Sequence, residues 1–118
     1  MDATSRIPLN PRDYLVLLAL TDGARHGYGL VKDIEAQSGG RVRVDPANLY
    51  RMLKRMISSG LVVESAESAR GDDGDDRRRY YEITRFGHEV VKLEAARLAE
   101  LTAVARSRHL LSETEATG

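Results

Sequence analysis

The chain of 118 residues contains no cysteine, no tryptophan and only one phenylalanine, and its formal net charge at pH 7 is zero. The absence of cysteine excludes disulfides and thiolate chemistry. Because aromatic residues are scarce, the core has to be built mainly from Leu, Val, Ile, Met and Ala. No apolar run approaches the ~20 residues that a membrane helix needs, and no signal-peptide pattern opens the chain. We therefore expect a cytoplasmic protein that does not enter a membrane.

The composition is that of a globular protein. Hydrophobic residues make up 42% of the chain and charged residues 31%, which is too apolar for a disordered chain. This length predicts one domain, or one domain followed by a long terminal helix.

The charged residues are unevenly distributed along the chain. Residues 41–63 carry five basic side chains and one acidic one, residues 64–76 carry six acidic and one basic, and residues 77–85 carry four Arg and one Glu. Two basic segments therefore flank a short acidic one, a pattern typical of a localised phosphate-binding face. The alternative is that these charges belong to solvated helix surfaces.

The first half of the chain predicts two short helices before a basic one. The first begins at Asn10 and Pro11, a capping residue followed by a residue that fits the first helical position. The second begins near His26, a structural or capping residue, and ends at two glycines. Residues 41–44 alternate with period two, which predicts either a very short strand or an extended link.

The third helix, from Pro46 to about Ser59, has two distinct faces. Its apolar residues recur at the spacing of one buried helical face: Leu49, Met52, Leu53, Met56 and Ile57. The opposite face is small, polar and basic, with Ala47, Arg51, Lys54, Arg55 and Ser58, flanked by Asn48 and Tyr50. Such a face can lie against a phosphate backbone and reach into a groove of DNA.

A β-hairpin and a long helix are predicted next. The strands begin at Leu61 and Arg79, on either side of a tip rich in Asp and Gly. Thr84 can cap the last helix, which runs from about Phe86 to Leu111 and is roughly 39 Å long at 1.5 Å per residue. Its apolar stripe would be exposed at one end unless it packs on a second chain; the alternative is a helix that folds back on its own domain.

The predicted fold class is mostly α with a small β-hairpin. Three helices followed by a hairpin form a winged helix-turn-helix, in which the third helix enters the major groove of DNA and the hairpin contacts the backbone. We divide the chain into a flexible arm (1–9), a winged-helix DNA-binding domain (10–85), a C-terminal dimerisation helix (86–111) and a frayed tail (112–118).

Three stretches of the sequence resemble the PadR-like family of transcriptional regulators. They are His26-Gly27-Tyr28-Gly29-Leu30, residues 45–61 with the third helix, and Arg78-Arg79-Tyr80-Tyr81-Glu82-Ile83-Thr84 with Gly87 after it. The resemblance covers roughly residues 11–111 and, with a single C-terminal helix, lies nearest the small subclass of the family. Ala47 and Asn48 depart from it, since many relatives have Gly and a hydroxyl residue there.

The resemblance implies a homodimer that binds a roughly palindromic operator in double-stranded DNA, usually as a repressor. Relatives often respond to aromatic or drug-like ligands, so a small-molecule effector is compatible with it. It also implies that the first and last helices make the dimer interface, for which the candidates are Tyr14, Leu18, Val90, Leu93, Leu98, Leu101 and Val104.

Candidate DNA contacts lie on the third helix and beside the wing tip. On the helix they are Asn48, Tyr50, Arg51, Lys54 and Arg55; which of the basic residues reads bases stays open. The resemblance implies that Tyr50 holds the DNA backbone, the alternative being a packing residue. The aspartates of the tip would repel phosphate, so Arg77, Arg78 and Arg79 are better wing contacts, unless they pair with those aspartates.

The sequence contains no catalytic or metal-binding pattern. Its three His lack metal-site spacing, and the Asp-rich tip lacks the ligand spacing of a calcium loop. No Ser-His-Asp order, phosphate loop or nucleotide fingerprint occurs. We therefore expect neither an enzyme nor a cofactor. The alternative to a DNA-binding regulator is a winged-helix protein-interaction module without DNA binding. The acidic wing and the zero net charge favour this alternative interpretation.

Overall fold

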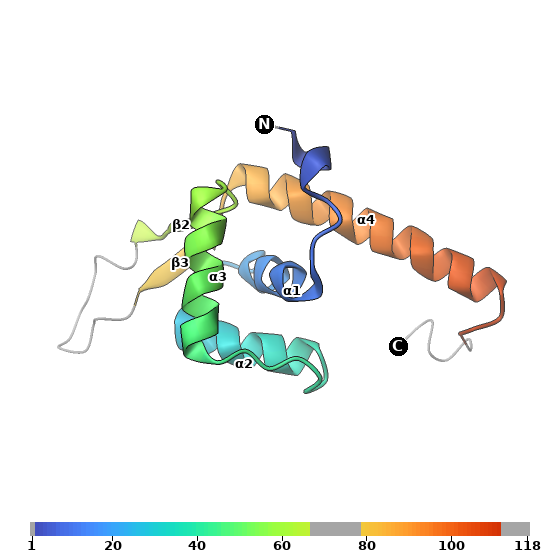
Figure 1. Ribbon diagram of the computed structural model, residues 1–118, viewed down its shortest axis with the longest axis horizontal. Coiled ribbons are helices and arrows are strands. Elements are labelled where there is room, and N and C mark those ends of the chain that lie inside the picture. Colours follow the sequence, from blue (N-terminus) through green and yellow to red (C-terminus); the bar gives the residue numbers. More distant parts are fainter. Residues whose placement is uncertain (1, 67–78, 112–118) are drawn as a thin grey trace.

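The computed structural model describes residues 2–66 and 79–111. Helices and short strands follow one another in the order predicted for a winged helix-turn-helix with a long C-terminal helix (Figure 1). They are η1 (Ala3–Arg6), α1 (Pro11–Leu20), β1 (Arg25–His26), α2 (Gly27–Gln37), α3 (Pro46–Ser58), β2 (Val62–Glu64), β3 (Tyr80–Ile83) and α4 (Arg85–Ser107). The predicted fold class is confirmed.

Each α-helix begins at a side chain that accepts a hydrogen bond from the backbone N–H three residues later. The caps are Asn10, His26, Asp45 and Thr84, with donor–acceptor distances of 2.9–3.1 Å. Proline follows the cap in α1 and α3, where its missing N–H would have had no helical partner. The helix starts are therefore encoded locally.

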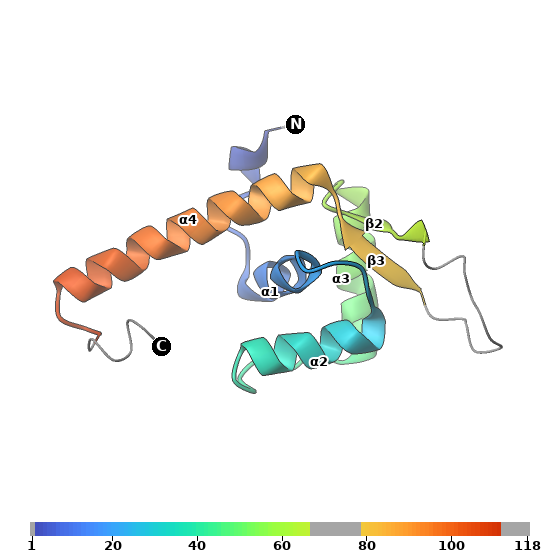
Figure 2. The same ribbon diagram turned by 180° about the vertical axis from the view of Figure 1, so that it is seen from behind.

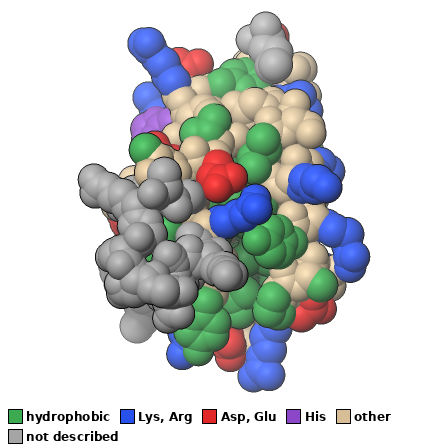
Figure 3. All heavy atoms as spheres, turned by 90° about the vertical axis from the view of Figure 1, so that its left-hand side faces the viewer, with side chains coloured by type: hydrophobic (Ala, Val, Ile, Leu, Met, Phe, Trp, Pro, Cys, Tyr) green, Lys and Arg blue, Asp and Glu red, His purple; other side chains and the backbone are tan. Residues whose placement is uncertain are grey.

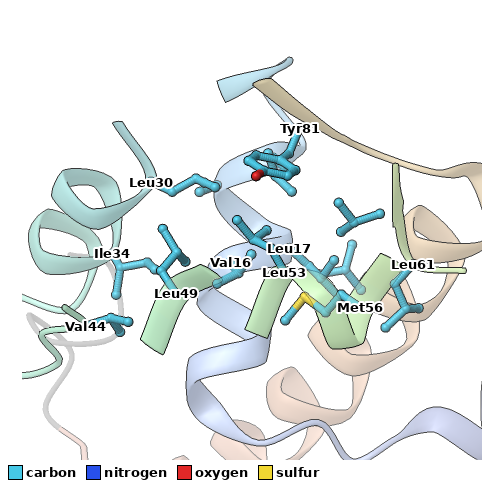
Figure 4. Close-up of a cluster of buried hydrophobic side chains, with 14 of the residues drawn as sticks. Val16, Leu17, Leu30, Ile34, Val44, Leu49, Leu53, Met56, Leu61 and Tyr81 are labelled. Atoms are coloured by element: carbon cyan, nitrogen blue, oxygen red, sulfur yellow. The ribbon is translucent and has the colours of Figure 1, made fainter. Parts of the chain in front are cut away.

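The core lies where α1, α2 and α3 meet the wing, the hairpin of β2 and β3 (Figure 4). The buried side chains labelled there are Val16, Leu17, Leu30, Ile34, Val44, Leu49, Leu53, Met56, Leu61 and Tyr81. Leu49, Leu53 and Met56 form the buried face of α3, as its periodicity predicted. Met52 is half-buried, and the prediction was wrong for Ile57, which is 39% exposed at the end of the helix. Because this face points into the core, the opposite face of α3 points outward.

The small sheet has the strand order β1-β3-β2, and both pairs are antiparallel. The pairing of β2 with β3 was predicted, and the structure places Val62 opposite Ile83. The strand β1 was not predicted, because two residues are too few for a periodic pattern. Residues 41–44 form the extended link rather than a strand.

Helix α4 starts over the winged-helix core and then extends well beyond it (Figures 1 and 2). Val90 and Val91, in its first half, are buried. The helix ends at Ser107, earlier than predicted, because His109 adopts a left-handed conformation with φ 61° that terminates a helix. Across the described ranges, no helix combines the length and apolarity required to cross a bilayer.

The prediction of a flexible arm over residues 1–9 was wrong for the part that the structure describes. The segment contains η1, which lies beside α4, and Ile7 and Leu9 are half-buried against the core. The backbone N–H of Leu9 also donates to a carboxylate oxygen of Glu94 in α4 at 3.1 Å. The arm packs because its apolar residues contact the core and the Leu9 N–H finds an acceptor on α4. A local sequence pattern does not reveal such distant partners.

Candidate nucleic-acid interface

The outward face of α3 carries the basic residues that the sequence singled out. Arg51, Lys54 and Arg55 are all exposed along it. Seen from the side of α3 and the wing, Lys and Arg side chains are spread over the molecule, with hydrophobic side chains between them (Figure 3). This face and the first turn of α1 together line an open groove, to which Arg12 adds another cation that the sequence did not single out.

Asn48 links the start of α3 to the first arginine on this face. Its side-chain amide donates to Asp45 at 2.9 Å, and its carbonyl oxygen accepts from Arg51 at 2.9 Å. Among residues 2–66 and 79–111, neither Arg51 nor Lys54 forms a salt bridge. Their positive charges are therefore available to an anionic partner such as a phosphate.

Arg55 differs from its two neighbours because it is paired with Asp13 of α1. Its Nη2 and Nη1 donate to the two carboxylate oxygens of Asp13 at 2.9 and 3.0 Å. The Asp13 side chain is 8% exposed and that of Arg55 is 53% exposed. These hydrogen bonds raise the pKa of Arg55 above its ordinary value, so it stays charged. Asp13 was missed because one acidic residue in a first helical turn is commonplace.

Tyr50 lies on the flank of α3 that faces the wing. The residue is 54% exposed, so a ligand can reach it, and its role as a phosphate contact or a partly buried packing residue stays a prediction. Burial is the larger cause, and a hydrogen bond with Tyr50 the second, of the raised pKa of the neighbouring Tyr81 in β3. Arg79, at the start of the wing strand, lies 3.7 Å from Glu64. The other two wing candidates, Arg77 and Arg78, fall outside the described residues.

Tyr28, at the start of α2, is also exposed beside this flank. Its ring stacks with that of His26 at a centroid distance of 6.4 Å, and the Nζ of Lys32 lies 5.2 Å from its centroid. A cleft of about 220 Å³ runs between Tyr28, Tyr50 and the wing. The motif that contains Tyr28 marked a helix start and did not reveal this exposure.

The candidate dimer residues divide into three groups. Val90 is fully buried in the core of its own domain, so its assignment to a dimer interface was wrong: the same helical stripe serves the domain core at its first turns. Tyr14, Leu18, Leu93 and Leu98 are half-buried. Leu101 and Val104 are 53% and 46% exposed on the part of α4 that extends beyond the core.

Within the described ranges, no group of three or more His, Asp or Glu side chains could hold a metal ion. The groove between α3 and α1 offers the cations Arg12, Arg51 and Lys54 to a ligand. This arrangement defines the class of winged-helix proteins: three helices are followed by a hairpin wing, and the basic face of the third helix points outward.

The comparisons with known proteins agree with this class. Residues 16–93 match the PadR-like family of transcriptional regulators. The chain is 36% identical over 93 residues to an uncharacterised 37.1 kDa protein in a transposon of Streptomyces fradiae; the match covers 79% of this chain but only 24% of that relative.

Solved structures of regulators share the fold. A transcriptional regulator from Clostridium thermocellum has a TM-score of 0.65 at 22% identity, with 81% of this chain and 87% of that chain covered. A PadR family regulator from Clostridium difficile gives 0.64 at 22% identity and 81% and 95% coverage. BpsR of Bordetella bronchiseptica gives 0.67 at 22% identity and 96% and 77% coverage.

The chain belongs to the PadR-like family of transcriptional regulators. Members of this family are regulators rather than enzymes, in agreement with the lack of catalytic motifs in the sequence.

Proposed function

We propose that this regulator acts as a homodimer that binds a roughly palindromic operator and represses transcription. The observation that carries the proposal is the outward face of α3. On it Arg51 and Lys54 are exposed, and neither forms a salt bridge with a described residue. The buried apolar face fixes the direction in which these cations point. A helix with this arrangement fits the major groove, where its cations meet phosphates and base edges.

The exposed part of α4 supports the dimer. Leu101 and Val104 lie one helical turn apart, and Leu98 and Ala105 are half-buried beside them. An apolar stripe on a helix that extends away from its own core is stabilised when a second copy covers it. A two-fold pair of α3 helices about 34 Å apart would then read half-sites separated by one turn of the duplex.

Release by a small-molecule effector is a further part of the proposal. BpsR, which shares the fold, is described as regulated in its DNA binding by 6-hydroxynicotinic acid. In this chain the cleft between Tyr28 and Tyr50 has the volume of a small ring compound and adjoins a proposed DNA contact. A ligand seated there would compete with DNA for Tyr50.

The test is a mobility-shift titration with the DNA upstream of the protein's own gene, repeated at several salt concentrations. We expect a shifted complex whose affinity falls steeply with salt, because each neutralised phosphate releases counterions. We also expect the free protein to sediment as a dimer. A protein that shifts no DNA at low salt would instead fit a winged-helix module that binds another protein.

A further inference from the structure

The ion pair between α1 and α3 distinguishes one arginine of the basic face from the others. We propose that Asp13 is a positioning residue that holds Arg55 to read a guanine of the operator, while Arg51 and Lys54 hold phosphates. The inference rests on the proposed DNA-binding function and assigns base reading within it.

The pair fixes the Arg55 guanidinium in one orientation. Each terminal nitrogen donates to a different carboxylate oxygen of Asp13, at 2.9 and 3.0 Å, so the guanidinium cannot rotate without breaking a hydrogen bond. Asp13 is nearly buried at the first turn of α1. A buried carboxylate that lost its partner would be strongly destabilised, so the pair persists when a ligand arrives.

The contact with Asp13 leaves a second pair of donors on Arg55. A guanidinium has five N–H groups, and Asp13 takes one from each terminal nitrogen. The N–H of Nε and the remaining N–H of Nη2 lie parallel along the side of the guanidinium, and no described residue accepts from Nε. Two parallel donors match the O6 and N7 acceptors of guanine. The Arg55 side chain is 53% exposed, so a ligand in the groove can reach it.

The charge of the pair favours a base over a phosphate. The Asp13 carboxylate cancels the positive charge of Arg55 at hydrogen-bond distance and would repel a phosphate placed beside it. The acceptors of guanine are uncharged, so they require fixed donor geometry rather than net charge. Arg51 and Lys54 suit phosphates instead, because no carboxylate among the described residues cancels their positive charges.

A purely structural brace between α1 and α3 would show the same hydrogen bonds, so the test has to measure base preference. Duplexes are selected from a random library by the wild-type protein, by Asp13→Asn and by the double variant Asp13→Asn/Arg55→Gln. The double variant removes both charges and therefore leaves no unpaired buried carboxylate. Asp33→Asn is the matched control, because it breaks the analogous 3.0 Å pair with Arg25 away from the groove.

We expect both Asp13 variants to lose preference for the same guanine in each half-site by about tenfold, the worth of one bidentate base contact. Binding to unrelated duplex should be kept or increased in Asp13→Asn, because Arg55 regains its uncompensated charge. The control should select the wild-type motif. If Asp13→Asn selects the wild-type motif while its affinities for specific and unrelated DNA fall together, Asp13 is only a brace and the inference is overturned. If the wild-type protein itself enriches no motif, the proposed function fails first.

Discussion

A carboxylate oxygen of Glu94 accepts a hydrogen bond from the backbone N–H of Leu9 at 3.1 Å, across 85 positions of the chain. The same carboxylate accepts from Arg97 at 2.7 and 2.8 Å, and its side chain is only 1% exposed. Glu94 thus ties the segment that leads into α1 to the helix that the proposal assigns to dimer formation. The domain and α4 are joined by this polar contact as well as by Val90 and Val91.

The free energy of unfolding should depend on the charge of Glu94. The hydrogen bonds from Arg97 hold the pKa of Glu94 below its ordinary value of 4.5, with a smaller contribution from the Leu9 N–H, while burial opposes them. A lowered pKa means that the carboxylate stabilises the fold above its unfolded pKa, and that this contribution is lost as pH falls through the folded value. We expect Glu94→Gln to lower the free energy of unfolding by about 1–3 kcal/mol at pH 7.

Urea denaturation at several pH values measures this effect. The difference between wild type and Glu94→Gln should shrink as the pH falls below 4.5. Glu100→Gln, on an exposed position of the same helix, is the control and should change stability by less than about 0.5 kcal/mol. A difference that stays constant from pH 7 to pH 3 would show that the charge of Glu94 is not what stabilises the contact.

Gly87 and Gly29 occupy the same third position of their helices and should respond oppositely to alanine. A Cβ on Gly87 would collide with the carbonyl oxygen of Leu61 and lie 2.9 Å from the Cγ1 of Ile83. We expect Gly87→Ala to destabilise the fold by at least about 1–3 kcal/mol. At Gly29 the nearest atom, in the His26 ring, is 3.5 Å away, so Gly29→Ala should be neutral or stabilising by up to about 1 kcal/mol. Thermal unfolding compares the two, and equal melting temperatures would contradict the packing argument.

Much of the fold could be predicted because its signals are local. A capping side chain and the amide that it satisfies are three residues apart, and a buried helical face repeats within two turns. The caps at Asn10, Asp45 and Thr84 and the two faces of α3 were therefore all found from the sequence.

The remaining features depend on residues that are far apart in the chain. The pairs Asp13–Arg55 and Leu9–Glu94 join segments 42 and 85 positions apart and have no sequence pattern. The error at Val90 has a related cause. Periodicity shows which side of α4 is apolar, but it does not show where along the helix the domain core ends.

The exposed end of α4 should control the oligomeric state. A glutamate at Leu101 or Val104 places a charge in the proposed apolar interface, where burying it without a partner is unfavourable. We expect Leu101→Glu and Val104→Glu to sediment as monomers with unchanged unfolding of the winged-helix domain. Operator affinity should fall by at least tenfold, because the two half-sites are no longer bound as one unit. Ala103 lies on the opposite face of the helix, so the Ala103→Glu variant is the control and should remain a dimer. Dimeric glutamate variants at both positions would place the interface elsewhere.

The two unpaired cations of α3 should set the salt dependence of DNA binding. Removal of one phosphate contact lowers the slope of log affinity against log salt by about 1, so Arg51→Ala and Lys54→Ala should each show this change on operator and unrelated duplex alike. Their melting temperatures should not change, since both side chains are exposed. The double variant Asp13→Asn/Arg55→Gln should keep the wild-type slope, because the charge of Arg55 is already neutralised by Asp13. Lys92→Ala, on the exposed surface of α4, is the control. A wild-type slope for both Arg51→Ala and Lys54→Ala would mean that this face of α3 does not meet the DNA backbone.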